Sequence, residues 1–289
     1  MIFKKFMSIA ITTAVILGCG ATINAAPSGY NIDETFPDQA LNVFVRKHFD
    51  LNSDGYLDSG EISEAGYKRE GGERSLTVIS YDNEIDSLDG LEIFTSCSSL
   101  NLYGGKMKKL DLTCLPFKSV SVTNLPELKT FVCGKNQTYV SIDDCPKLKN
   151  TFFNYAYNLK DLNIISCPSI TGSVYLDNCS QMRNFTAQSS GISEIIFHEK
   201  AEIFSLWVVN CPLDYLEMRG PKMLYEFIIM TNGKAETSMS VGSSMLDFLW
   251  TMRRKDGRGF EYNSDRAIWP EVVLDIYYGN MKDLDHLYV

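Results

Sequence analysis

Residues 50–61 place oxygen-bearing side chains at the spacing that wraps a chain around a metal ion. Calcium is a hard cation that takes roughly six to eight oxygen ligands, which a twelve-residue loop of this pattern supplies. Gly55 stands at the sixth position, where the chain must turn sharply. The expected ligands are Asp50, Asn52, Asp54, the backbone carbonyl of Tyr56, Asp58 through a water, and Glu61 with both carboxylate oxygens. The loop therefore predicts a calcium site; the alternative is an acidic surface turn, since these residue types are common in turns.

The segments on either side of the loop have the patterns of short helices. Residues 36–49 predict an amphipathic helix, because a proline stands near the start and apolar side chains recur on one face, at Leu41, Phe44, Val45 and Phe49. Residues 61–65 predict a short exiting helix. The second loop that usually accompanies such a site is missing, because the acidic segment 82–90 has its glycine too late. A single site of this kind is expected to bind calcium for structural stability rather than to act as a calcium sensor.

The first 25 residues have the pattern of a secretory signal peptide. Two lysines precede an apolar run of thirteen residues, 6–18, which is too short to span a bilayer with ease, and Ala25 ends a small-residue cleavage site. An alternative is a lipoprotein signal, in which Cys19 would be lipidated and would anchor the chain. We favour simple secretion. Either signal takes the chain out of the cytoplasm, and we expect no membrane-spanning segment after it.

Charge and length limit the partners and the number of domains. The formal net charge is -9, and it becomes -11 without residues 1–25, which contain two lysines and no acid. An acidic chain of this kind is expected to repel nucleic acid and anionic membranes. About 264 residues remain after cleavage, enough for a large core in one or two domains.

A repeat runs from residue 75 to about residue 232. Short apolar strands recur every ten to twelve residues, so that two strands make a unit of about 21 or 22 residues. A proline marker follows every second strand, in Asn124-Leu-Pro126, Asp144-Cys-Pro146, Ser166-Cys-Pro168 and Asn210-Cys-Pro212, with Ser189-Ser-Gly191 in the missing place. Proline removes a ladder donor, so each marker is expected to end its strand in a turn.

The cysteines follow the same period. The segment after residue 25 contains seven, an odd number, and from Cys114 onward their gaps are close to multiples of ten or eleven residues. Residues that recur at one phase of a repeat are expected to stack in the interior, where cysteine behaves as a small hydrophobic residue. We therefore expect a ladder of reduced thiols rather than a disulfide scaffold. The seven are Cys97, Cys114, Cys133, Cys145, Cys167, Cys179 and Cys211.

Repeats of this length with Leu-x-Leu strands, such as 100–102 and 110–112, predict a leucine-rich-repeat solenoid, an α/β or mainly β fold. The order of parts, with a Phe-Pro-Asp helix, one calcium loop, the segment 85–94 and then the repeats, resembles secreted leucine-rich-repeat proteins of anaerobic gut and oral bacteria. The resemblance covers residues 31–230 and implies a surface or secreted binding protein. The repeats here depart from that family in being rich in Phe, Tyr and Cys.

The two ends are expected to cover the solenoid. Residues 31–68 would form an N-terminal cap around the calcium loop, and residues 237–289 a C-terminal cap outside the repeat. Within the latter, residues 243–252 predict a helix, 253–258 its basic end, and 267–278 a final strand or helix. The basic end is expected to be cations that favour a helix C-terminus rather than an anion-binding patch.

Catalytic motifs are missing from the sequence. The three histidines, His48, His198 and His286, lie far from one another in the chain, and no phosphate loop, nucleophile elbow or zinc-protease motif occurs. The periodic cysteines are expected to be buried and inert, and the carboxylate pair Asp143/Asp144 to be a solvated turn. We therefore expect a protein that is not an enzyme.

Two functions remain in view. In the first, the solenoid face recognises an extracellular protein or glycan through exposed side chains, since tyrosine and tryptophan dominate binding hot spots. Its candidate residues are Tyr155, Tyr157, Tyr175, Trp207 and Tyr215, with Lys129 and Asn154 as further exposed candidates. In the second, the chain is a structural part of the cell envelope or of a secreted multi-protein assembly. Dockerins build such assemblies with duplicated calcium loops, whereas this chain has one.

Overall fold

The computed structural model describes residues 29–80, 82, 84–213 and 215–218, together with the backbone of the strands at 226–231, 238–241, 273–277 and 287–288. Its N-terminal part consists of β1 (Tyr30–Asn31), α1 (Ile32–Thr35), α2 (Gln39–His48), β2 (Tyr56–Leu57) and α3 (Ser59–Glu64). A 3-10 turn, η1 (Leu91–Ile93), lies between the first two coils of the solenoid that follows. The predicted signal peptide, Cys19 and the helix predicted at 243–252 lie outside the described residues.

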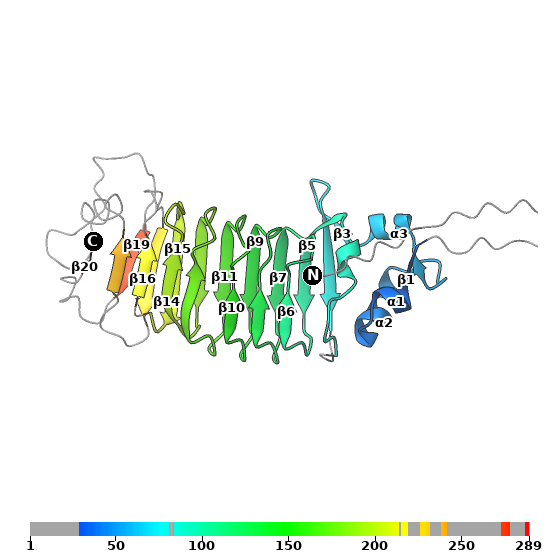
Figure 1. The fold of residues 1–289 in the computed structure, drawn as a ribbon, viewed down its shortest axis with the longest axis horizontal. Helices are drawn as coiled ribbons and strands as arrows, with labels where there is room; N and C mark the ends of the chain where they lie inside the picture. Colours follow the sequence, from blue (N-terminus) through cyan, green and yellow to red (C-terminus); the bar gives the residue numbers. More distant parts are fainter. Residues whose placement is uncertain are drawn as a thin grey trace, which may run out of the picture.

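Stacked coils with two strands each form the solenoid (Figure 1). A ten-stranded sheet, here called the long sheet, begins with β3 (Tyr67–Lys68), which pairs antiparallel with β4. Each coil then contributes one strand to it: β4 (Arg74–Ile79), β5 (Cys97–Tyr103), β7 (Ser119–Thr123), β9 (Tyr139–Asp143), β11 (Asp161–Ile165), β13 (Asn184–Gln188), β15 (Ser205–Cys211), β17 (Glu226–Thr231) and β19 (Val273–Tyr277). The other strand joins one of two opposite sheets. These are β6 (Lys109–Asp111), β8 (Thr130–Val132) and β10 (Asn150–Phe152), then β12 (Gly172–Leu176), β14 (Ile192–Phe197), β16 (Tyr215–Met218), β18 (Ser238–Val241) and β20 (Leu287–Tyr288).

The pairing confirms the predicted repeat and adds to it. Neighbouring strands from β4 onward run parallel, with partners 20 to 23 residues apart within the regular part, as in Ser99 with Ser119 and Asp161 with Asn184. Parallel strands lie on both sides of each coil, however, whereas the sequence predicted one sheet on one face. The sheets also continue beyond residue 232, where a cap outside the repeat was expected, because β18, β19 and β20 pair with preceding strands. Between the end of β17 and the start of β19 lie 41 residues, which is longer than the spacing of the repeat. The periodicity of the sequence therefore did not predict that the sheet continues.

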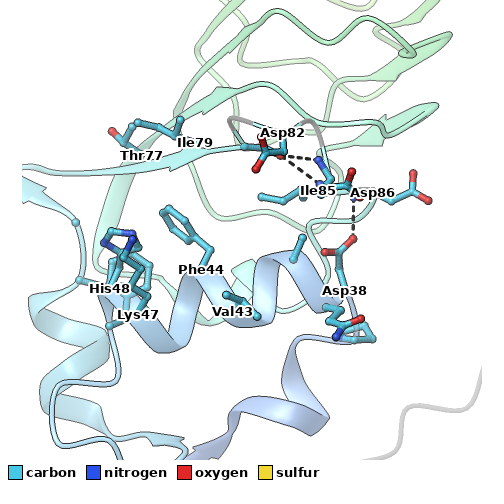
Figure 2. A pocket seen from close by; sticks show the side chains of 18 of the residues that line it. Asp38, Val43, Phe44, Lys47, His48, Thr77, Ile79, Asp82, Ile85 and Asp86 are labelled. Atoms are coloured by element: carbon cyan, nitrogen blue, oxygen red, sulfur yellow. Dashed lines mark hydrogen bonds between the residues drawn. The ribbon is translucent and has the colours of Figure 1, made fainter.

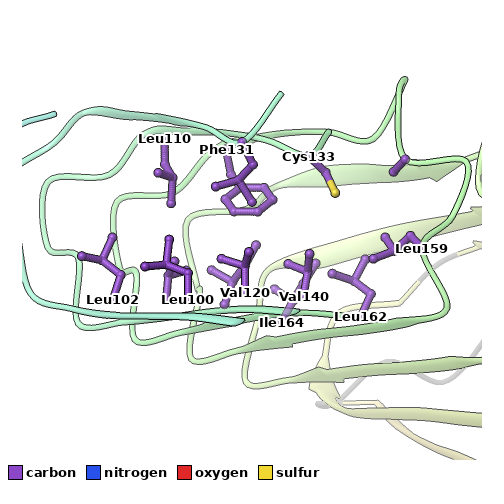
Figure 3. Packing of buried hydrophobic residues seen from close by; sticks show 14 of the residues in the cluster. Leu100, Leu102, Leu110, Val120, Phe131, Cys133, Val140, Leu159, Leu162 and Ile164 are labelled. Atoms are coloured by element: carbon purple, nitrogen blue, oxygen red, sulfur yellow. The ribbon is translucent and has the colours of Figure 1, made fainter. Parts of the chain in front are cut away.

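The core lies between the two layers of strands. Alternate residues point inward, and Figure 3 shows Leu100, Val120 and Val140 from the long sheet facing Leu110 and Phe131 from the opposite strands. These side chains are almost fully buried. In every coil the apolar residues occupy the same inward positions, so they contact those of the next coil. The interior is therefore one continuous cluster rather than a set of separate cores.

A column of left-handed residues closes the turns that follow the long-sheet strands. Gly104, Asn124, Asp144, Ser166, Ser189 and Asn210 all have positive φ, between 50° and 78°. Several of their N–H groups donate to the last strand residue of the next coil, as in Asn124 to the Asp143 carbonyl at 3.1 Å and Ser166 to the Gln188 carbonyl at 2.9 Å. Asn, Asp and Gly tolerate this conformation best, which explains Asn124, Asp144 and Asn210 before their Leu-Pro or Cys-Pro markers, while Ser166 takes the same place before the fourth. The turns predicted at these markers are confirmed.

Among the described residues, no helix has both the length and the apolar character needed to cross a membrane.

Valine at one of these positions is expected to destabilise the fold. Because a β-branched side chain is strongly disfavoured at positive φ, N124V should lower the free energy of unfolding by about 1–2 kcal/mol. T123V is the matched control, since Thr123 is the neighbouring strand residue and points away from the core. Urea unfolding followed by circular dichroism measures both. Equal midpoints for N124V and T123V would contradict the role assigned to the left-handed column.

Candidate functional site: a calcium loop and the groove beside it

The predicted calcium loop is folded around its first and last carboxylates. Asp50 and Glu61 are 8% and 7% exposed, far less than is usual for acidic residues. The Asp50 carboxylate accepts hydrogen bonds from the N–H groups of Asp54 and Gly55, both at 3.1 Å. Gly55 has a φ of 83°, which is the sharp turn that the sequence predicts at the sixth position. The loop thus encloses its negative charge in backbone N–H groups.

Glu61 links the end of the loop to its beginning. One carboxylate oxygen accepts from the Leu51 N–H at 2.8 Å, and the other accepts from the Asp58 N–H at 3.0 Å. The Glu61 N–H donates in return to Asp58 Oδ1 at 2.8 Å, which makes a capping box at the start of α3. A residue predicted as a metal ligand therefore also begins the exiting helix.

A short strand that the sequence did not reveal, β1, pairs with the strand β2 inside the loop. β1 pairs antiparallel with β2, with Tyr30 opposite Leu57 and Asn31 opposite Tyr56. The Ile32 N–H donates to the Gly55 carbonyl at 3.1 Å, and Leu57 is fully buried. β1 thus occupies the side of the loop where a second loop would otherwise pair. Two residues give no periodic signal, so sequence reasoning could not find this strand.

The donor set of the loop fits calcium in its chemistry. Asp50, Asn52, Asp54, Asp58 and Glu61 supply oxygen atoms only, as a hard cation requires. Within the described part of the chain, no three acidic, cysteine or histidine side chains form a group at metal-binding distance. Asp54 instead accepts from the Tyr56 N–H at 2.8 Å. The backbone turn of the loop is formed, and Asp50 Oδ1 and Asn52 Oδ1 both accept from the Asp54 N–H.

A groove of about 1390 Å³ lies next to the loop, between α2 and the outer side of β4. Figure 2 shows Phe44 and His48 on α2 facing Thr77 and Ile79 on β4. The rings of Phe44 and His48 stack with centroids 4.5 Å apart, and Val43 is 59% exposed. Glu61 also lines the groove, so the predicted calcium site and the groove share a wall.

Asp38 and three phenylalanines attach this cap to the solenoid. Asp38 Oδ1 accepts from the Leu41 N–H at 2.8 Å and so caps α2, while Oδ2 accepts from the Asp86 N–H at 2.7 Å, a bond drawn in Figure 2. The Phe94 ring lies 6.2 Å from that of Phe36 and 5.2 Å from that of Phe49, between centroids. The position of α2 relative to β4, and hence the width of the groove, depends on these contacts.

The groove opens onto the outer face of the long sheet, which is polar but nearly uncharged. Its middle row, in register from β4 to β15, is Thr77, Asn101, Ser121, Ser141, Asn163, Thr186 and Trp207. The flanking rows are Ser75, Ser99, Ser119, Tyr139, Asp161, Asn184 and Ser205 on one side, and Ile79, Tyr103, Thr123, Asp143, Ile165, Gln188 and Val209 on the other. Side-chain hydrogen bonds join neighbouring strands, as from Asn163 Nδ2 to the Tyr139 hydroxyl at 3.1 Å. The face is therefore ordered before any partner arrives.

The aromatic residues predicted to bind a partner lie on three different parts of the solenoid. Trp207 is on the outer face of the long sheet. Tyr175 and Tyr215 are on the opposite strands β12 and β16, where the Tyr215 hydroxyl donates to Glu217 at 3.0 Å. Tyr155 and Tyr157 lie in the turn before β11, as does Asn154, and Lys129 lies in the turn before β8. These residues do not share one surface, because the solenoid has strands on both sides.

The other candidate groups are mostly buried or separated. Six of the seven described cysteines are buried free thiols, and Cys114 is exposed. Burial raises the pKa of the Cys133 thiol to about 12. The contact with Cys145, with burial added, raises the pKa of Cys167 well above its usual range. His48 lines the groove, His198 lies in the turn after β14, and His286 is outside the described residues.

Comparison with models of known protein families gives no match for this chain, and comparison with curated proteins gives none either. The family resemblance of the sequence therefore stays a prediction.

Alkylation should distinguish the exposed cysteine from the buried ones. Because the thiolate is the reactive form, iodoacetamide at pH 8 should modify Cys114 in the native protein and leave Cys133 and Cys167 unmodified. Peptide mass spectrometry reads each site separately. In guanidinium chloride all of them should react, which controls for peptide recovery. Native labelling of Cys133 as fast as that of Cys114 would contradict the buried ladder.

Proposed function

We propose that this chain is an extracellular or cell-surface recognition protein. Its partner, a protein or a glycan, would bind on the outer face of the long sheet and in the groove beside α2. Calcium would stabilise the N-terminal cap. The groove is the observation that carries the proposal, since it is large, open and continuous with an ordered face.

The composition of this surface suits recognition rather than catalysis. One wall is apolar and aromatic, with Val43 and Phe44, and the floor offers the hydroxyl of Thr77. Binding sites commonly combine apolar walls with a few polar groups that fix orientation. Asp143 and Asp161 are the charged residues among the outer-row side chains of β4 to β15 named above, so the face carries little charge. The groove lining is acidic, with six carboxylates against Lys47 and Lys106, so it favours a partner that presents positive charge there.

The calcium loop supports the proposal through its position. It joins α2 to α3, and Phe49 at the end of α2 packs against Phe94 of the solenoid. Calcium held by Asp50 and Glu61 would offset the repulsion of buried carboxylates and fix the end of α2. The groove wall would then be rigid before binding, which lowers the entropic cost of association.

The expected location and family belong to the same proposal. Residues 1–25 are proposed to direct secretion, with lipidation at Cys19 as the alternative. The repeat of about 21 residues and the Leu-x-Leu strands favour a divergent leucine-rich-repeat solenoid. The strands on both sides of each coil differ from the single sheet expected for a leucine-rich-repeat solenoid, which is why we propose a divergent member.

Calcium should raise the thermal stability of the protein. A ligand that binds only the folded state stabilises it, so calcium at a hundredfold excess over its Kd should raise Tm by about 5–10 °C. E61Q should abolish the increase, because it removes the bidentate ligand. E70Q, the same charge change on an exposed turn, should keep it. Scanning calorimetry in calcium and in chelator measures this, and identical curves for the unmodified chain would refute the calcium site.

Bulky charges on the outer face should block the proposed partner. S121K and N163K together place two cations in the middle row of the long sheet, while N150K places one on the opposite strand β10 as a control. Binding to a printed array of polysaccharides and extracellular proteins should fall by roughly tenfold or more for the double variant at the spots that the parent recognises. N150K should bind as the parent does. Unchanged binding of the double variant at every spot would remove the face from the proposal.

A further inference from the structure

The turns that lead into the long-sheet strands, here called the entry turns (112–118, 133–138, 153–160, 177–183 and 198–204), carry a column of residues of which three in four are cations. Lys118, Thr138, Lys160 and Arg183 stand at the same place in successive coils. Backbone hydrogen bonds of 2.7 to 2.8 Å connect them, from each N–H to the carbonyl of the preceding member. The recognition surface described above uses none of these residues.

Three lysines of these turns surround a cavity of about 420 Å³. Lys118, Lys135 and Lys160 line it, and all three are exposed. The remaining lining residues are Pro116, Asn136, Thr138, Asn158 and Gln181, so the described lining contains no carboxylate. Amide hydrogen bonds between coils hold the turns in place, from Asn136 Nδ2 to the Leu115 carbonyl at 2.9 Å and from Asn158 Nδ2 to the Lys135 carbonyl at 2.8 Å.

The charge of these lysines is not neutralised within the described part of the chain. None of the three has a carboxylate within ion-pair distance there, although the protein as a whole is acidic. The opposite edge also carries a column of exposed lysines without an ion pair, Lys108, Lys129 and Lys149, but a carboxylate lies among them. There Lys147 pairs with Glu127 at 2.5 Å, and this hydrogen bond, with Lys129 and Lys108 nearby, lowers the pKa of the Glu127 carboxyl. The three entry turns at 112–118, 133–138 and 153–160 contain the three lysines of the cavity and no acidic residue, so they form a local positive site on a negative molecule, and that favours an anionic ligand.

Aromatic side chains lie on the same edge. Tyr155 and Tyr157 are 57% and 50% exposed in the entry turn that also contains Asn158 and Lys160. In the next coils the Arg183 guanidinium lies over the Phe204 ring, 5.6 Å from its centroid. Large, half-exposed rings beside cations offer flat surfaces on which a sugar ring can stack.

The spacing of the cations along the solenoid matches the charge spacing of one kind of polyanion better than that of another. Neighbouring coils are about 4.8 Å apart, so Lys118 and Lys160, two coils apart, are separated by roughly 10 Å along the solenoid. Duplex nucleic acid carries a charge about every 1.7 Å, which is far denser and would be repelled by the acidic remainder of the chain. A polysaccharide with one carboxylate per sugar has a lower charge density, closer to this pattern.

We propose that the entry turns bind an acidic polysaccharide. Its carboxylates contact Lys118, Lys135 and Lys160, its hydroxyls contact the amides of the cavity, and its rings stack on Tyr155 and Tyr157. This site is separate from the outer face of the long sheet and does not depend on the function proposed for that face.

The test uses the full chain and polygalacturonate, with its methyl-esterified form as an uncharged counterpart. Parent protein should bind polygalacturonate, bind the ester at least several-fold more weakly, and lose affinity as salt is raised. The triple variant K118Q/K135Q/K160Q should bind roughly tenfold or more weakly, as expected from three exposed ion pairs. The triple variant K108Q/K129Q/K149Q removes three lysines from the opposite edge, with the same change in net charge, and should bind as the parent does.

Several outcomes would overturn the proposal. These are no binding of polygalacturonate, equal binding of the ester, or equal weakening in the two triple variants. Tighter binding of a duplex oligonucleotide, lost with the same three lysines, would assign the site to nucleic acid instead. Y155A/Y157A tests the rings and should weaken polygalacturonate binding without changing its salt dependence; unchanged affinity would refute the stacking. Thermal melting of each variant, expected to match the parent, separates loss of binding from loss of fold.

Discussion

The structure depends on one constraint, which is that every coil must satisfy the backbone hydrogen bonds of the next. Parallel strands about 4.8 Å apart leave no room for a coil whose turn differs much in path. The left-handed residues from Gly104 to Asn210 meet this requirement, because each reverses the chain at the same point. The N–H groups of Asn124, Asp144, Ser166 and Ser189 donate to the next coil. Once this column is fixed, the inward apolar residues, the outer rows and the entry turns all fall into register.

The same constraint creates a problem at the N-terminal end, where β4 has no preceding parallel coil. An unpaired edge strand is open to association with other chains. Here β3 pairs antiparallel with β4, and the cap then packs nearby through Phe36, Phe49 and Phe94. Asp38 contributes to both parts at once, since one oxygen caps α2 and the other accepts from residues 86 and 87. The groove is the space left between this cap and β4, so it is a consequence of how the end is covered.

The periodicity of the sequence predicted the features that recur in every coil, and it missed the features that occur once. The inward residues and the turns at the proline markers recur at a fixed phase, so they were visible. The buried cysteines do not share one phase, since Cys145, Cys167 and Cys211 follow the left-handed residues while Cys133 and Cys179 lie in the entry turns. The exposed Cys114 breaks the ladder because it lies in the entry turn after β6, two positions beyond Leu112, the residue in register with Cys133. β1 is too short for a periodic signal, and the pairing of β17 with β19 bridges a separation outside the repeat length. The groove depends on Asp38 meeting Asp86, a contact between residues 48 positions apart that no local pattern encodes.

Function in such a fold follows from which phase of the repeat a side chain occupies. The middle outer row of the long sheet holds small polar residues from β4 to β13, where like charges at about 4.8 Å spacing would repel one another along the row. Cations are instead found in the turns, where the chain path leaves side chains more room, as at Lys118, Lys135 and Lys160. One backbone repeat thus presents two chemically different surfaces, a nearly neutral face and a positive edge. A ligand for one is not expected to compete with a ligand for the other, because they lie on different sides of the coil.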